Sequence, residues 1–206
     1  MNSILNEISA GLAAMSGWEA AAVLLGIAYL LLAMRENIWC WAAAAISTAI
    51  YLVIFWDVGL LMEAALQVYY LVMAAYGWYH WRYGVADKAE LLPIERWTAR
   101  WHFFAITGII VLSAASGYLL SQHTEARLPY IDSFTTWASI LTTWMVARKI
   151  LENWLYWIVI DTVSIGLYLD RALYLTVLMF ALYVIIAVFG FRGWHRHWVE
   201  EQRAKA

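Results

Sequence analysis

Long apolar stretches separated by short polar connections dominate the pattern of residues along the chain. A helix needs about 20 mostly apolar residues to cross the hydrocarbon core of a bilayer, and roughly 17 to 25 are tolerated. Connections such as Arg35-Glu36-Asn37 and Asp170-Arg171 place charges where the chain would turn back in water. The pattern predicts seven membrane-spanning helices, at residues 18–34, 38–56, 60–79, 103–121, 133–147, 151–169 and 172–191.

Residues 1–17 precede the first span and have a different character. Ile4, Ile8 and Leu12 recur at helical spacing, but no basic stretch precedes them. This combination predicts a short amphipathic surface helix rather than a cleaved signal peptide.

The sequence also resembles itself. The segment that begins Glu36-Asn37 is similar to the one that begins Glu152-Asn153, and Gly77-Trp78 is similar to Gly193-Trp194, with an offset of 116 residues in both cases. Spans 1–3 would then correspond to spans 5–7. Four crossings restore the direction of the chain, so the halves would be parallel repeats joined by span 4.

The predicted fold class is therefore an all-α membrane protein with a 3+1+3 parallel repeat, the architecture of the SWEET-type sugar transporters. In transporters built from repeats, the substrate site lies at the repeat interface. The predicted parts are an N-terminal amphipathic segment (1–17), a first three-helix repeat (18–81), a cytoplasmic loop, linker helix 4 and outer loop (82–132), a second three-helix repeat (133–198) and a cytoplasmic tail (199–206).

Composition supports a multi-pass membrane protein. The 206 residues are 65% hydrophobic and 14% charged, whereas a soluble domain has about half apolar and about a quarter charged residues. The net charge of −2 and the lack of a clustered basic patch argue against a nucleic-acid partner. The expected surroundings are a lipid bilayer.

The basic residues predict the orientation of the chain. If the N-terminus is outside, only Arg127 and Arg171 of the 13 basic residues lie on the outer side. Cytoplasmic connections carry the excess of Lys and Arg in membrane proteins, so a cytoplasmic C-terminus is predicted. The residues on the inner side are Arg35, Arg82, Lys88, Arg96, Arg100, Arg148, Lys149, Arg192, Arg196, Arg203 and Lys205.

The sequence lacks the residues that several classes of membrane protein need. A retinal sensor needs a lysine inside its last span, and a haem protein needs histidines at depth, but the lysines and histidines lie at span ends or in loops. No nucleophile and base occur together within the spans, and the single cysteine, Cys40, excludes a multi-cysteine zinc site. We expect neither enzymatic activity nor a metal or other cofactor.

The sixth span carries the most informative polar pattern. Trp154, Trp157, Asp161 and Ser164 recur at steps of three and four residues, so they share one helix face. Asp161 lies near the middle of the span, where a carboxylate costs at least a few kcal/mol unless it is paired, hydrated or protonated. Since no Arg or Lys occupies the core of any span, a cationic or hydroxyl-rich substrate would supply the missing partner.

The tryptophans and the third span add candidate contacts. The indole of Trp157 shares a face with Asp161 and could stack on a flat cation, whereas Trp154 could equally be an interfacial anchor. In the third span Glu63, Gln67 and Tyr70 form a second polar stripe. Under the 116-residue offset Asp161 corresponds to Ala45, Trp157 to Trp41 and Gln67 to Tyr183.

These motifs resemble the PnuC family of vitamin transporters. The likeness rests on Glu152-Asn153-Trp154-Leu155-Tyr156-Trp157 followed by Asp161, which is similar to that family's Trp-x-x-Trp-x-x-x-Asn/Asp element, and on Gln67-Val68-Tyr69-Tyr70. The resemblance implies a bacterial inner-membrane carrier that takes up nicotinamide riboside by facilitated diffusion. It further implies substrate contacts at Trp154, Trp157, Asp161 and Gln67, a cytoplasmic kinase that traps the product, and a homotrimer.

Three questions stay open at the level of sequence. Thiamine also carries a quaternary ring nitrogen, and relatives of the resembled family are thought to move thiamine, riboflavin or deoxynucleosides. Asp161 could instead take up a proton, which would make the carrier a symporter. A structural or signalling membrane subunit is a further alternative, although it would not explain an unpaired carboxylate beside two indoles.

Overall fold

The computed structural model describes residues 2–57, 59, 61–84, 92–124, 127–170 and 172–205, and they form eight helices. The prediction of an all-helical chain is confirmed. The shortest of the helices after α1 have 18 residues, or about 27 Å of length, close to the ~30 Å of a hydrocarbon core. The helices are α1 (Asn2–Ala14), α2 (Gly17–Met34), α3 (Cys40–Asp57), α4 (Leu61–Tyr83), α5 (Ala99–His123), α6 (Pro129–Ala147), α7 (Asn153–Asp170) and α8 (Tyr174–Lys205).

Four of these helices, α2, α3, α5 and α8, are long and apolar enough to cross a membrane on length and composition alone. The helices α4, α6 and α7 are as long, with 23, 19 and 18 residues, but they carry more polar residues. Polar residues lower the mean hydropathy of a helix and are tolerated at membrane depth when they face a protein interior.

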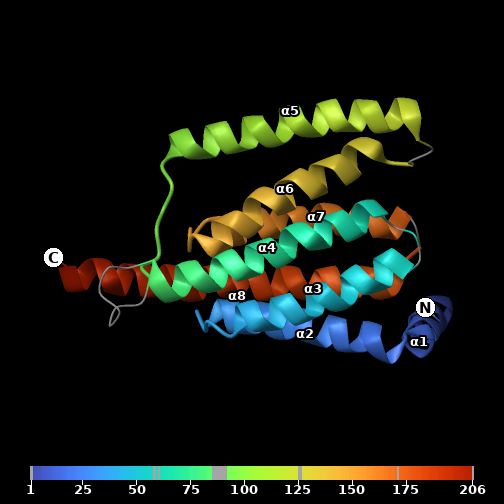
Figure 1. Cartoon of the computed structure of the whole chain (residues 1–206), viewed down its shortest axis with the longest axis horizontal. Coiled ribbons are helices and arrows are strands. Elements are labelled where there is room, and N and C mark those ends of the chain that lie inside the picture. The colour runs from blue at the N-terminus through green and yellow to red at the C-terminus, as the bar shows by residue number, and fades with distance from the viewer. Residues whose placement is uncertain are drawn as a thin grey trace.

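Six helices form a closed ring. Helix α3 packs between α2 and α4, and α7 packs between α6 and α8. The ring closes because α8 packs against α2 and α4 packs against α6. Helix α5 lies outside the ring on α6, and α1 lies across the start of α8, where Leu175 contacts Gly11 (Figure 1).

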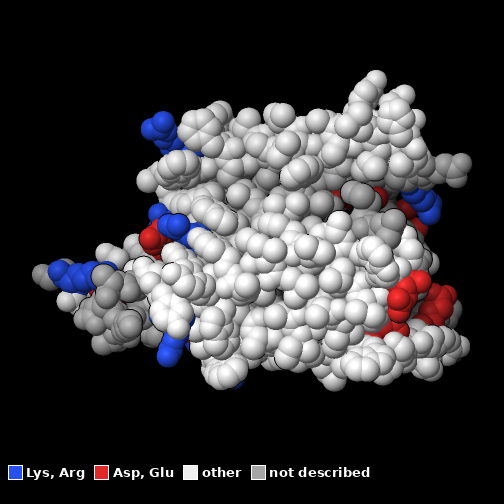
Figure 2. Space-filling view, in the orientation of Figure 1, with Lys and Arg blue, Asp and Glu red and all other residues white. Residues whose placement is uncertain are grey.

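The two ends of the ring differ in charge. The two chain termini lie at opposite ends (Figure 1), and Lys and Arg gather at the end where α8 finishes, whereas the middle of the visible face is free of charged side chains (Figure 2). We call this the basic end; α2, α4, α6 and α8 finish there. Its described basic residues are Arg35, Arg82, Arg96, Arg100, Arg148, Lys149, Arg192, Arg196, Arg203 and Lys205. Lys88 and Arg171 lie outside the described residues.

Helices α2 and α6 finish at the basic end in the same way. Glu36 and Lys149 both adopt left-handed backbone conformations, with φ of 55° and 52°. Their N–H groups donate to Ala33 and Val146, and the following N–H groups, of Asn37 and Ile150, donate five residues back, to Leu32 and Met145. This is the Schellman arrangement, in which glycine is the usual left-handed residue.

Two buried tryptophans pack on glycines in matching positions of the two halves. A Cβ on Gly77 of α4 would lie 2.3 Å from the ring of Trp41, and a Cβ on Gly190 of α8 would lie 2.7 Å from the ring of Trp154. Only glycine allows such an approach. Trp41 and Trp154 are 113 residues apart, as are Gly77 and Gly190.

Two hydrogen bonds join the halves, and both their donors and their acceptors are 113 residues apart in the sequence. The indole N–H of Trp81 donates to the carbonyl of Val146 at 3.3 Å, and that of Trp194 donates to the carbonyl of Ala33 at 3.1 Å. Each donor stands edge-on to a buried indole, with centroids 5.5 Å apart in both the Trp41–Trp81 and the Trp154–Trp194 pairs.

These pairs show that equivalent positions are 113 residues apart, so the 116-residue offset predicted from the sequence is wrong. A shift of three residues is nearly one helical turn, which leaves most residues on the same helix face. An apolar pattern therefore matches almost equally well in both registers. With the observed register Asp161 corresponds to Thr48, Trp157 to Ala44, and Tyr183 to Tyr70.

Candidate functional site

Helix α7 has two faces of different chemistry. Asp161 and Ser164 are buried, each with 4% of its surface exposed, and Trp157 is half-buried on the same face. Tyr156, Val159 and Ile160 lie on the other side of the helix, where they meet α5 and α6. Asp161 and Ser164 therefore lie away from α5, whereas Trp157 also packs against the cluster of Ile109, Ala138 and Ile160.

Asp161 is a buried carboxylate without a bonding partner. It is the ninth of the 18 residues of α7, which places it halfway along the helix. No described residue donates a hydrogen bond to it or forms an ion pair with it. Such a group in the middle of a helix of membrane length is costly, and intramembrane carboxylates of this kind typically mark a substrate or proton pathway.

The phenol of Tyr183 on α8 lies within electrostatic range of Asp161, and Tyr51 of α3 lies within the same range of this phenol. The Tyr183 hydroxyl also lies 3.8 Å from the position of a Cβ on Gly26, so α2 leaves room for it. Ser47, beside Gly26, donates to the carbonyl of Ala22 at 2.7 Å.

A second polar group lies where α4 meets α6. Ser139 of α6 lies beside the Tyr70 side chain, and the hydroxyl of the adjacent Tyr69 donates to the carbonyl of Ile140 at 2.7 Å. Tyr29 of α2 lies near Tyr70. Because Tyr70 and Tyr183 are 113 residues apart, each half contributes a phenol at the same point of α4 and α8. Gln67, one turn before Tyr70, is half-buried.

The structure separates two of the predicted site residues from these groups. Trp154 is 1% exposed and packs in the core between Gly190 and Trp194. Glu63 is exposed in the first turn of α4, at the end opposite the basic end. A direct substrate contact at Trp154 would require its indole to be uncovered.

Three tyrosines of the interior were missed from the sequence: Tyr29, Tyr51 and Tyr183. The signal that would have found Tyr183 is the repeat itself, read in the 113-residue register, since its equivalent Tyr70 was already a candidate. The 116-residue offset hid this match because it placed Tyr183 opposite Gln67.

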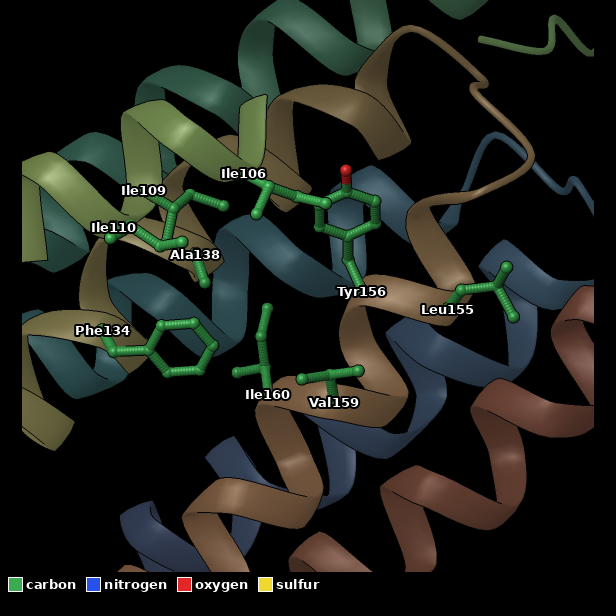
Figure 3. Close-up of a pocket in the computed structure, with 9 residues that line it drawn as sticks. All are labelled: Ile106, Ile109, Ile110, Phe134, Ala138, Leu155, Tyr156, Val159 and Ile160. Atoms are coloured by element: carbon green, nitrogen blue, oxygen red, sulfur yellow. The ribbon is translucent and has the colours of Figure 1, made fainter. Parts of the chain in front are cut away.

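A separate cavity of about 330 Å³ lies between α5, α6 and α7. Figure 3 shows that its lining is apolar except for Tyr156, whose hydroxyl points away from the aliphatic side chains; that hydroxyl bonds the Nδ1 atom of His102 at 2.9 Å. The cavity offers a polar solute almost nothing to bind. Its lining residues are Ile106, Ile109, Ile110, Phe134, Ala138, Leu155, Tyr156, Val159 and Ile160.

No cluster of His, Cys, Asp and Glu that could hold a metal ion occurs among the described residues. The polar groups of the interior are a carboxylate, phenols, hydroxyls and an amide. These can bind a polar or cationic solute, but they include no paired nucleophile and base.

A ring of membrane-length helices with a polar interior, and with no charged side chains at the middle of the face in Figure 2, defines a multi-pass membrane protein built to handle a polar solute. Residues 16–196 match the nicotinamide mononucleotide transporter family, and the chain belongs to that family. This is a family of transporters, not of enzymes, and the PnuC resemblance predicted from the sequence is confirmed.

Relatives support this membership across nearly the whole chain. The nicotinamide riboside transporter PnuC of Escherichia coli K12 is 26% identical over 211 residues, covering 91% of this chain and 88% of that protein. The riboflavin/roseoflavin transporter RibM of Streptomyces davaonensis is 25% identical over 186 residues, covering 87% and 84%.

The fold is also similar to a crystal structure of the vitamin B3 transporter PnuC. The two structures share a TM-score of 0.73 at 20% sequence identity, over 96% of this chain and 90% of that one. The comparison shows that the chain has a PnuC-like fold.

Proposed function

We propose that the chain transports a vitamin or vitamin precursor across a membrane, and that its substrate is nicotinamide riboside. Family membership and the relatives named for vitamin transport support the general assignment. The observation that carries the specific one is the buried carboxylate of Asp161, which has no hydrogen-bond or ion-pair partner among the described residues.

The chemistry of nicotinamide riboside fits the polar interior. Its pyridinium ring is a flat cation, so it would supply the charge that Asp161 lacks and could stack on the indole of Trp157. Ser164, Gln67 and Tyr70 offer donors and acceptors to the ribose hydroxyls. Trp154 and Glu63 stay predicted contacts, although the structure buries the first in the core and exposes the second in the first turn of α4.

The proposed topology has seven crossings, α2 to α8, arranged as a 3+1+3 parallel repeat of the SWEET type. The reciprocal contacts at 113 residues and the position of α5 outside the ring support it. The basic end is cytoplasmic, since Lys and Arg are retained on that side, and the N-terminus is outside. The expected location is a bacterial inner membrane, with a cytoplasmic kinase trapping the product and a homotrimer as the assembly.

Uptake into liposomes tests the assignment. Purified protein should accumulate labelled nicotinamide riboside down its gradient, and excess unlabelled nicotinamide riboside should compete better than thiamine or riboflavin. Asp161→Ala and Trp157→Ala should each reduce uptake at unchanged protein content. Equal uptake by both variants and the wild type would show that the site lies elsewhere, and stronger competition by thiamine or riboflavin would reassign the substrate.

Proton coupling is the second candidate, and the same carboxylate favours it. A buried carboxyl that loses and gains a proton during the cycle is a common device for coupling in transporters. Uptake that stops when a proton ionophore is added would establish symport. Uptake that is indifferent to the ionophore would support facilitated diffusion.

A further inference from the structure

We propose that Glu36, Lys149 and His197 form a latch that closes the basic end of the ring, and that substrate leaves on this side only after the latch opens. This inference rests on the proposed transport function. It concerns residues far from Asp161, at the point where the two halves of the ring meet.

The central contact is a buried ion pair. The Lys149 ammonium lies 2.7 Å from a carboxylate oxygen of Glu36, and their side chains are 2% and 11% exposed. The ammonium also donates to the carbonyl of Leu92 at 2.9 Å and lies 4.9 Å from the ring centre of Trp81. Lysine is almost never buried so completely unless it is paired.

The pair joins equivalent positions of the two halves. Glu36 and Lys149 are 113 residues apart and occupy the same left-handed position after α2 and α6. They therefore meet where the approximate two-fold axis of the ring leaves the basic end. Left-handed conformations are uncommon in residues other than Gly, Asn and Asp, and those that persist often mark functional points.

His197 extends the pair to a third helix. Its Nδ1 atom lies 2.5 Å from the second carboxylate oxygen of Glu36. One carboxylate in the first half thus holds the α6–α7 turn and helix α8 of the second half together. The reciprocal Trp81 and Trp194 hydrogen bonds cross between the halves at this same end.

The energetics of such a pair suit a reversible closure. Taking two charges out of water offsets much of their attraction, so the net stabilisation is modest, whereas removing one partner leaves a buried charge and is strongly destabilising. When the basic end opens, water can reach both charges. The latch can therefore hold the end closed without making opening prohibitive.

A second ion pair at the same end provides a matched control. Arg96, in the connection before α5, lies 2.9 Å from Glu152, which also accepts from the backbone N–H of Trp97 at 3.1 Å. This contact ties the connection to the second half alone. Breaking it removes an ion pair from the basic end without separating the halves.

The single cysteine reports the opening. Cys40 begins α3, one turn after Glu36, and is 0% exposed. The rate at which N-ethylmaleimide modifies Cys40 is measured in detergent without substrate, for the wild type, Glu36→Gln, Lys149→Met, His197→Gln and Glu152→Gln. Melting temperatures of the same samples identify any variant that labels merely because it has unfolded.

The latch predicts that Glu36→Gln and Lys149→Met label on the order of tenfold faster than the wild type or more, because each leaves the closed end without its pair. His197→Gln, a milder change at a partly exposed residue, should give an intermediate rate, and Glu152→Gln the wild-type rate. Wild-type rates in Glu36→Gln and His197→Gln, or an equal increase in Glu152→Gln, would overturn the proposal. Since no substrate is present, this outcome is independent of whether nicotinamide riboside is transported.

Discussion

The two glycines under the buried indoles give the most quantitative prediction. An alanine at Gly77 would place its Cβ 2.3 Å from Trp41, and one at Gly190 would place it 2.7 Å from Trp154. Carbon atoms in contact prefer about 3.5–4.0 Å, so each indole would have to move by roughly 1 Å or more. Neither ring has free space around it, since both are almost fully buried.

Overpacking of this kind costs about 1–3 kcal/mol. Since 1 kcal/mol shifts the melting temperature of a chain of this size by roughly 2–4 °C, Gly77→Ala and Gly190→Ala should each melt roughly 2–12 °C below the wild type. Thermal unfolding of the detergent-solubilised protein, followed by intrinsic tryptophan fluorescence, measures the shift.

Two other helical glycines serve as controls. A Cβ on Gly108 of α5 or Gly166 of α7 would meet nothing within 4 Å. The Ala variants at these positions should melt at or above the wild-type temperature, because alanine is the better helix former. If Gly190→Ala were as stable as Gly108→Ala, the close packing of Trp154 on α8, and with it the matching of the two halves, would be refuted.

Three further predictions follow from the same contacts. Trp81→Phe and Trp194→Phe should lower the melting temperature by similar amounts, because each removes one of two reciprocal hydrogen bonds worth about 1 kcal/mol; a large effect of only one would contradict their equivalence. If riboflavin is also carried, Asp161→Asn should weaken uptake of cationic nicotinamide riboside more than uptake of neutral riboflavin. An equal loss for both substrates would show that the site does not recognise charge. His197 should make stability pH-dependent: its hydrogen bond with Glu36 raises the pKa of the imidazole, with Glu201 adding to the increase and Lys149 opposing it. The stabilising charge is present below the ordinary pKa of about 6.5 and is lost as the pH rises through the raised value, so the difference in melting temperature between the wild type and His197→Gln should shrink with rising pH.

The positions of the helices could be predicted from sequence because the length of an apolar stretch is a local property. Each predicted span coincides with one helix from α2 to α8 to within a few residues, except that α4, α5 and α8 extend further at the basic end and α6 begins four residues earlier at the opposite end. These extensions are helical turns that contain Arg and His. Because such turns are polar, the hydropathy pattern alone could not show that the helices continue through them.

The register of the repeat and the role of Trp154 could not be predicted. A three-residue shift preserves the helix face, so the correct offset appears only where two helices touch, as at Gly190 and Trp194. The pattern on α7 likewise places Trp154 and Asp161 on one face. It cannot show that Gly190 of α8 makes room for the indole of Trp154 in the packed core. The latch was missed because Glu36 and Lys149 are distant in the sequence and looked like ordinary turn charges.

In the proposed transport function, the face of α7 that bears Asp161 lines a path that water and substrate can enter. The most direct test places a cysteine on that face while keeping Asp161, as Ser164→Cys in a Cys40→Ala background, and measures its modification by a charged, water-soluble thiosulfonate with and without nicotinamide riboside. The reagent should modify this cysteine, and nicotinamide riboside should slow the modification. A folded protein in which this cysteine resists the reagent from both sides of the membrane would contradict it.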